Sequence, residues 1–95
     1  MSLIDEYEKR LNKLTIQKRL LALKITTQLK LLEKFIEIAE EGADIVGELR
    51  READRLKDLL YGSPYREKGY FDVIEEIDKL KEEIEEMRNR LGRGG

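Results

Sequence analysis

The chain contains no cysteine, histidine or tryptophan, and only one of its 95 residues is proline. Without cysteine it forms neither a disulfide nor a thiolate–metal bond, and without histidine it lacks the commonest general base and transition-metal ligand of proteins. No apolar run approaches the roughly 20 residues that a membrane-spanning helix needs. We therefore expect no cofactor, no catalytic residue and no membrane association.

What the chain has in abundance is charge, which accounts for 42% of its residues. Lys and Arg number 19 against 21 Asp and Glu, so the net charge is −2 and gives no overall attraction to polyanions. Plentiful Glu, Lys, Leu and Ile with few aromatic residues are typical of all-α proteins. This composition is thermophile-like and equally compatible with de novo design. The acidic N-terminus does not resemble a signal peptide, so we expect a cytoplasmic protein.

Apolar periodicity predicts an all-α fold in a single domain spanning residues 1–95. The predicted helices cover residues 2–41, 44–60 and 71–91, with a loop at residues 61–70. Apolar residues recur every three or four positions along the first and last helices, as in antiparallel bundles and coiled coils. At 1.5 Å per residue the first helix is about 60 Å long, nearly the length of the other two end to end.

Local chemistry predicts where these helices begin and end. Ser2 followed by Asp5 favours a capped first turn, and Gly42 suits a helix C-terminus with positive φ. Asp44 is expected to cap the second helix. Gly47 inside that helix costs up to about 1 kcal/mol relative to alanine, which is tolerable if it permits close approach to the first helix.

The two charge signs are segregated along the chain. The segment from Lys9 to Lys30 holds seven bases and no acid, whereas the segment from Glu67 to Glu86 holds nine acids and three lysines. A third helix that continues from the second toward the N-terminus would lay these segments side by side. A third helix that reverses would form a compact bundle and cover the many-sided apolar surface at residues 20–38. A dimer that buries this surface against a second copy satisfies both requirements.

We expect a non-enzymatic protein that acts by protein–protein association, as a homodimer or other homo-oligomer, or as an adaptor or regulator with another protein partner. Heptad faces of the first and third helices are the expected interface, and exposed salt bridges of about 0.2–1 kcal/mol each would orient it rather than drive it. The predicted interface residues are Leu20, Leu23, Leu31, Ile38, Ile77, Leu80, Ile84, Met87 and Leu91.

Aromatic residues cluster between the second and third helices, four of the chain's six falling within positions 61–71. They form either a recognition loop, since Tyr and Arg are enriched at binding hot spots, or a plug over the first helix. The residues concerned are Tyr61, Tyr65, Arg66, Tyr70 and Phe71. Two polar residues, Lys18 and Gln28, occupy positions of the first helix's apolar seam, where they reach solvent or fix register.

Two other functions compete with association. A nucleic-acid-binding regulator would use the basic face of the first helix, although no helix-turn-helix spacing accompanies it; its residues are Lys9, Lys13, Lys18, Arg19 and Lys24. A magnesium-dependent nucleotide phosphohydrolase would use acids near the end of that helix; these are Glu37, Glu40, Glu41, Asp44 and Glu48. All-helical nucleotide pyrophosphatases also need an acid pair on the next helix, where Arg51 and Arg55 stand here. A solvated helix face explains these acids more simply.

Overall fold

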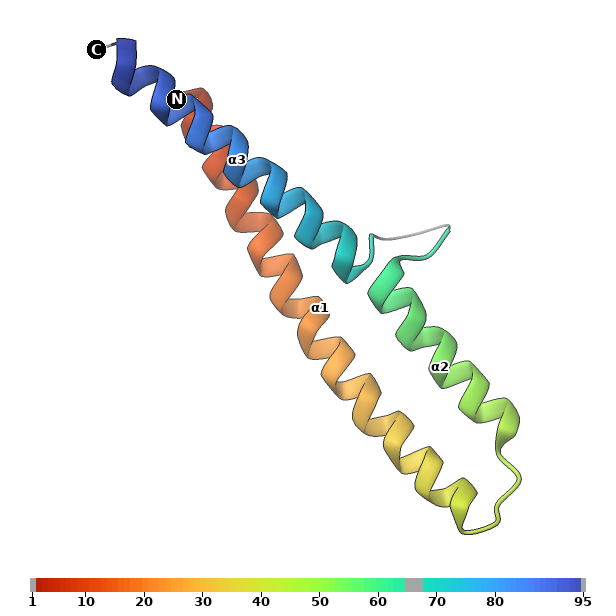
Figure 1. Ribbon diagram of the computed structural model, residues 1–95. Coiled ribbons are helices and arrows are strands. Elements are labelled where there is room, and N and C mark those ends of the chain that lie inside the picture. Colours follow the sequence, from red (N-terminus) through yellow and green to blue (C-terminus); the bar gives the residue numbers. More distant parts are fainter. Residues whose placement is uncertain (1, 65–67, 95) are drawn as a thin grey trace.

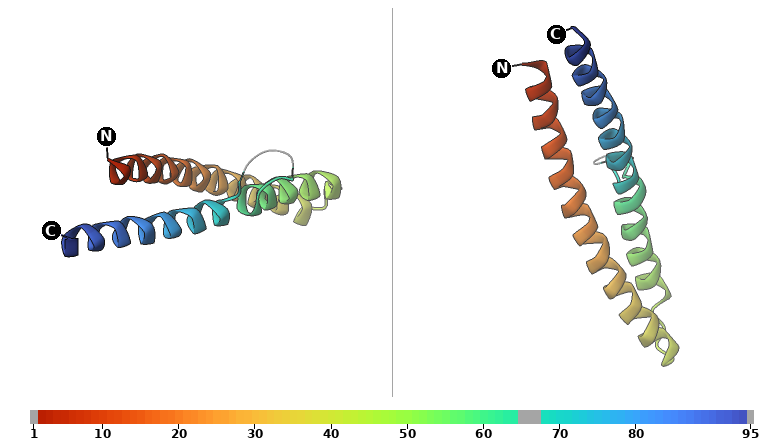
Figure 2. Two further views of the ribbon diagram at one scale, coloured as in Figure 1. Left: turned by 90° about the horizontal axis from the view of Figure 1, so that it is seen from above. Right: turned by 60° about the vertical axis from the view of Figure 1, so that its left-hand side comes forward.

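The structure, a computed structural model, describes residues 2–64 and 68–94 and contains three helices. These are α1 (Leu3–Glu40), α2 (Val46–Tyr61) and α3 (Tyr70–Gly94), and no strand occurs in the described residues. The all-α prediction is therefore confirmed. Both α2 and α3 run antiparallel to α1 and follow one another along one side of it (Figures 1 and 2). The molecule is consequently a rod of 70 × 23 × 18 Å.

Both ends of α1 follow the local chemistry expected of them. The backbone N–H of Asp5 donates to the Ser2 hydroxyl at 3.2 Å, and the Asp5 carboxylate accepts from the Ser2 N–H at 3.4 Å. This reciprocal capping box satisfies two N–H groups that the first turn leaves without a helical partner. At the other end, Gly42 has a φ of +102°, which confirms the predicted left-handed residue after the helix.

Two predictions about α2 and α3 are wrong, and one condition set by the sequence is not met. Ile45, not Asp44, occupies the N-cap of α2, and no side chain caps the helix there. A Cβ added at Gly47 would meet nothing within 4 Å, so this glycine permits no close approach. Finally, α3 passes beyond Leu91 and ends at Gly94, because glycine lowers helix propensity without blocking the backbone hydrogen bonds as proline does.

The buried core forms where α3 begins to pack on the middle of α1. Leu21 of α1 contacts Val73 and Ile77 of α3, and Leu11, Leu14, Leu59 and Tyr70 pack around this cluster partly buried. Leu80 and Ile84 continue the buried row along α3. The three-and-four spacing predicted for the third helix thus forms an internal seam with α1.

The third helix lies along the N-terminal half of α1, so the acidic and basic segments run side by side (Figure 1). The ion pair that joins the two helices nevertheless has the opposite polarity, from Arg88 of α3 to Glu8 of α1. No recorded ion pair among the described residues joins a base of α1 to an acid of α3. The inner face of α3 is apolar, and most of its acids therefore face solvent.

Candidate functional site

A second apolar row runs along α1, distinct from the seam that packs on α2 and α3. We call it the outer stripe, and its members are Ile16, Leu20, Leu23, Thr27, Leu31 and Ile38. Steps of three, four or seven residues keep these side chains on one face of a helix with 3.6 residues per turn. The five apolar members are between 39% and 65% exposed. The fold therefore leaves this row largely exposed while it buries Leu21 on the inner seam, although Leu23 and Thr27 also line a hollow between α1 and α2.

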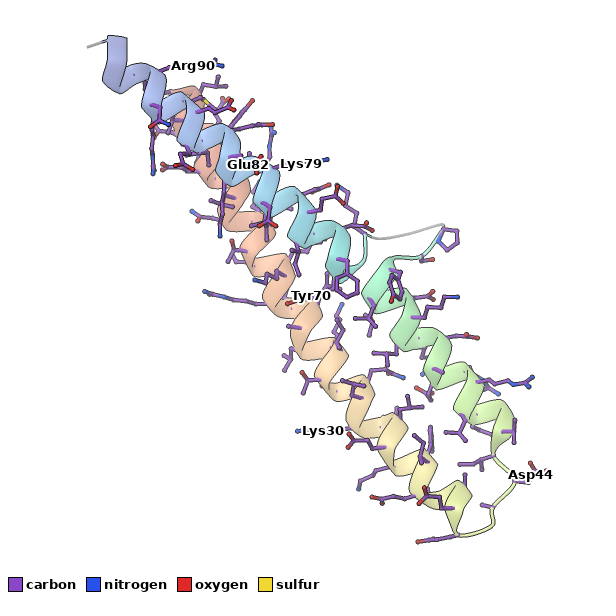
Figure 3. The ribbon with its side chains drawn as sticks, viewed as in Figure 1. Lys30, Asp44, Tyr70, Lys79, Glu82 and Arg90 are labelled. Carbon is purple, nitrogen blue, oxygen red and sulfur yellow. The ribbon has the colours of Figure 1, made fainter. Side chains whose placement is uncertain are left out.

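Cationic side chains border the outer stripe. Lys24 and Lys30 lie on its two edges, and both are exposed. Figure 3 shows Lys30 projecting from α1 on the side opposite α2. An apolar strip with a charged, solvated margin has the composition of a protein interface, which combines an apolar centre with a polar rim.

The structure divides the predicted interface residues between two different faces. Those of α1, namely Leu20, Leu23, Leu31 and Ile38, are exposed members of the outer stripe. On α3, Ile77, Leu80 and Ile84 are buried, Met87 is half-buried and Leu91 is exposed. The buried α3 residues belong to the chain's own core, whereas the α1 residues of the predicted interface remain exposed.

The aromatic cluster divides in a similar way. Tyr70 is half-buried and packs against the core between α1 and α3, as a plug would (Figure 3). The rings of Tyr61 and Phe71 lie 5.5 Å apart between centroids, and both side chains are largely exposed. Tyr65 and Arg66 lie outside the described residues, so the recognition-loop hypothesis stays a prediction.

The structure contains a buried polar contact between α1 and α2, of which the sequence predicts only one partner. Glu52 is only 7% exposed and accepts hydrogen bonds from Gln28 Nε2 at 2.5 Å and from Arg55 Nη1 at 3.1 Å. Gln28 Nε2 also donates to the Glu52 backbone carbonyl at 2.9 Å. The sequence predicts Gln28 on the apolar seam of α1 but does not predict its partner. Glu52 nevertheless continues the helical spacing of Leu49 and Leu56. This contact joins α1 to α2 and supplies the buried Glu52 carboxylate with hydrogen-bond donors.

Replacing Gln28 by leucine is expected to lower the free energy of unfolding by about 1–3 kcal/mol, because the buried Glu52 carboxylate loses a hydrogen-bond donor. Urea denaturation followed by circular dichroism measures this loss. Gln17→Leu is the matched control, since no side-chain hydrogen bond of Gln17 is recorded among the described residues. The control should change stability by less than about 0.5 kcal/mol; equal losses in the two variants would contradict the role of the pair.

The bases considered for nucleic-acid binding are mostly free of the core. Lys9, Lys13, Arg19 and Lys24 are exposed on α1, and none of them takes part in an ion pair recorded among the described residues. Lys18 lies half-buried at a seam position, as its place in the heptad predicts. The exposed four remain available to an anionic partner.

The acids considered as magnesium ligands do not converge. Glu37, Glu40, Glu41, Asp44 and Glu48 are all exposed. Among the residues that the structure describes, no group of three or more acidic side chains is placed to hold a metal ion.

Within the described part of the chain, no helix is long and apolar enough to cross a membrane. No protein-family model, curated protein or solved structure matches the chain.

Proposed function

We propose that this chain is a non-enzymatic helical protein that acts by protein–protein association through the outer stripe of α1. The observation that carries this proposal is the row of exposed apolar side chains from Ile16 to Ile38. Large contiguous apolar patches are uncommon on monomeric proteins and mark interaction sites. Full burial of one large aliphatic side chain stabilises by about 1.5–3 kcal/mol, and the members of the row are still 39–65% exposed, so covering several of them together favours association.

The rest of the fold presents this row on a rigid support. Its opposite side is anchored by α2 along one half of α1 and by α3 along the other (Figure 2). An anchored helix loses little conformational entropy on binding, which favours recognition through apolar anchors at helical spacing. The elongated shape also keeps the whole row accessible to a partner helix.

Sedimentation velocity over a concentration series tests the proposal. We expect the wild type to sediment above the monomer mass and the double variant Leu23→Ser, Leu31→Ser to sediment as a monomer, because both leucines belong to the outer stripe. Helix content should be unchanged, since neither leucine is buried. Leu3→Ser, Leu91→Ser is the matched control, as these leucines are 56% and 66% exposed but lie off the stripe. A wild type that stays monomeric to millimolar concentration contradicts self-association. A control that dissociates equally contradicts the outer stripe as the contact surface.

A second function, binding of a polyanion such as RNA, is favoured by the exposed and unpaired bases of α1. Lys13 and Lys24 would contact phosphates, and affinity would fall steeply with salt as counterions are released. Heparin retention at about 150 mM salt that is lost in Lys13→Glu, Lys24→Glu would favour this function. Elution of the wild type at low salt would favour protein association alone.

A further inference from the structure

We infer that the occupant of the outer stripe is the outer stripe of a second copy of this chain, docked antiparallel with a twofold axis at Thr27. This inference rests on the association proposed above and adds the partner, the orientation and the register. It is drawn from the spacing of the exposed residues and from the charges that flank them.

The spacing of the stripe is symmetric about Thr27. Ile16 and Ile38 both lie eleven positions from it, and Leu23 and Leu31 both lie four positions from it. In a twofold contact each residue faces the residue at the same distance on the other side of the axis. Ile16 of one copy therefore faces Ile38 of the other, and Leu23 faces Leu31, so apolar side chains meet on both sides of the axis.

The remaining positions fit the same arrangement. Leu20 and Lys34 both lie seven positions from Thr27, so the leucine faces the aliphatic stem of a lysine whose amine reaches solvent. The eleven-residue repeat corresponds to about 3.67 residues per turn, which keeps the row nearly straight along the helix. At the axis, the Thr27 hydroxyl already donates to the Leu23 carbonyl at 3.0 Å, so its burial leaves no donor unsatisfied.

Charge selects the antiparallel orientation over the parallel one. Arg19 precedes Thr27 by eight positions, whereas Glu33 and Glu37 follow it by six and ten. In the twofold dimer Arg19 lies level with the gap between Glu33 and Glu37 of the other copy, on the same edge of the contact. All three are exposed, and none takes part in an ion pair recorded among the described residues. A parallel pairing in register would instead place each basic residue that flanks the stripe beside the same residue of the other copy, which is repulsive.

Single cysteines test this geometry in the full chain, which has no cysteine of its own. When two helix axes lie about 8–10 Å apart, the facing Cα atoms are closer together than the axes. They then come within reach of a disulfide, which needs a Cα–Cα distance of about 4.4–6.8 Å. We expect Thr27→Cys to form a disulfide dimer in a glutathione buffer about a hundredfold faster than Asp78→Cys on α3, because docking raises the effective thiol concentration. A mixture of Leu23→Cys with Leu31→Cys should cross-link between the two variants rather than within either. Self-linkage of Leu23→Cys as fast as that of Thr27→Cys would overturn the antiparallel register.

A charge swap gives a second readout that does not depend on oxidation. Arg19→Glu and Glu37→Lys should each weaken the dimer by up to about 25-fold, because the upper end for one exposed pair is about fivefold and the twofold dimer contains the pair twice; the double variant should regain affinity. A double variant no tighter than either single one would overturn the register. If the wild type sediments as a dimer but both tests fail, the antiparallel geometry is wrong and the proposed association stands. If the wild type is a monomer, a second copy is not the occupant of the outer stripe, and this inference is wrong.

Discussion

Replacing Gly69 by alanine is expected to destabilise the chain by about 3 kcal/mol, near the upper end of overpacking costs. A Cβ at this position would overlap the backbone nitrogen of Gly62, and it would lie 2.5 Å from both the carbonyl oxygen of Leu60 and the carbonyl carbon of Tyr61. All three are backbone atoms, so no side chain can rotate away to relieve the clash. The junction between the end of α2 and the start of α3 would have to open.

Gly47→Ala is the matched control for that substitution. An added Cβ there meets nothing within 4 Å, and the residue lies inside α2. Alanine should therefore stabilise this helix by about 0.5–1 kcal/mol, since glycine loses more backbone entropy on folding. Chemical denaturation of the two variants should give shifts of opposite sign. A Gly69→Ala protein as stable as the wild type would mean that α2 and α3 do not approach this closely at Gly69.

The helix ends show which local features could be predicted from sequence. Ser2 and Gly42 act through their own side-chain or backbone chemistry, and both behave as predicted. Asp44 has equally suitable chemistry but stands one residue before the actual N-cap, because the turn after α1 places Ile45 there. Gly47 would suit a close approach between α1 and α2, but a Cβ added there meets nothing within 4 Å. Local propensity therefore located these helices to within a few residues, and tertiary geometry decided the rest.

The sequence shows that α1 is apolar on two faces, but it does not show which face packs on α2 and α3. Leu20 and Leu21 are adjacent leucines in a helical pattern, and sequence alone cannot say which of them faces α3. The assignment depends on the path of α2 and α3 along one side of α1. For the same reason the sequence predicts Ile77 as an interface residue together with Leu20, although the fold buries Ile77 in the core. An apolar seam has the same spacing whether its partner lies in the same chain or in another.

The charge pattern predicted that α1 and α3 lie side by side, but it did not predict which residues form the ion pair between them. Acidic α3 lies along basic α1, yet Glu8 and Arg88 form the ion pair that joins them. Seam positions 73, 77, 80 and 84 are apolar, so the intervening acids are directed outward to solvent. The Glu52 contact could not be predicted from the charge pattern, since its partner Gln28 lies 24 positions away and is brought near only by folding. Long-range contacts of this kind are set by the antiparallel fold, which sequence spacing does not contain.

Truncating Leu21 to alanine is expected to lower the free energy of unfolding by about 2–5 kcal/mol, the range for a large aliphatic residue removed from a packed core. Leu21 is 6% exposed and is the one buried residue of α1, where it contacts Val73 and Ile77. The remaining cavity lies where α3 begins, so α3 loses its main contact with the middle of α1. Urea denaturation at low chain concentration measures the loss in the monomer.

Leu20→Ala separates this effect from that of the outer stripe. The two leucines are neighbours and lose the same atoms, but Leu20 is 55% exposed on the other face. Its truncation should change the stability of the monomer by less than about 0.5 kcal/mol, as surface substitutions do. It should instead weaken self-association, because the methyl groups removed are those proposed to meet a second copy. Equal destabilisation of the dilute monomer by the two variants would mean that α1 has one buried face rather than an inner seam and an outer stripe.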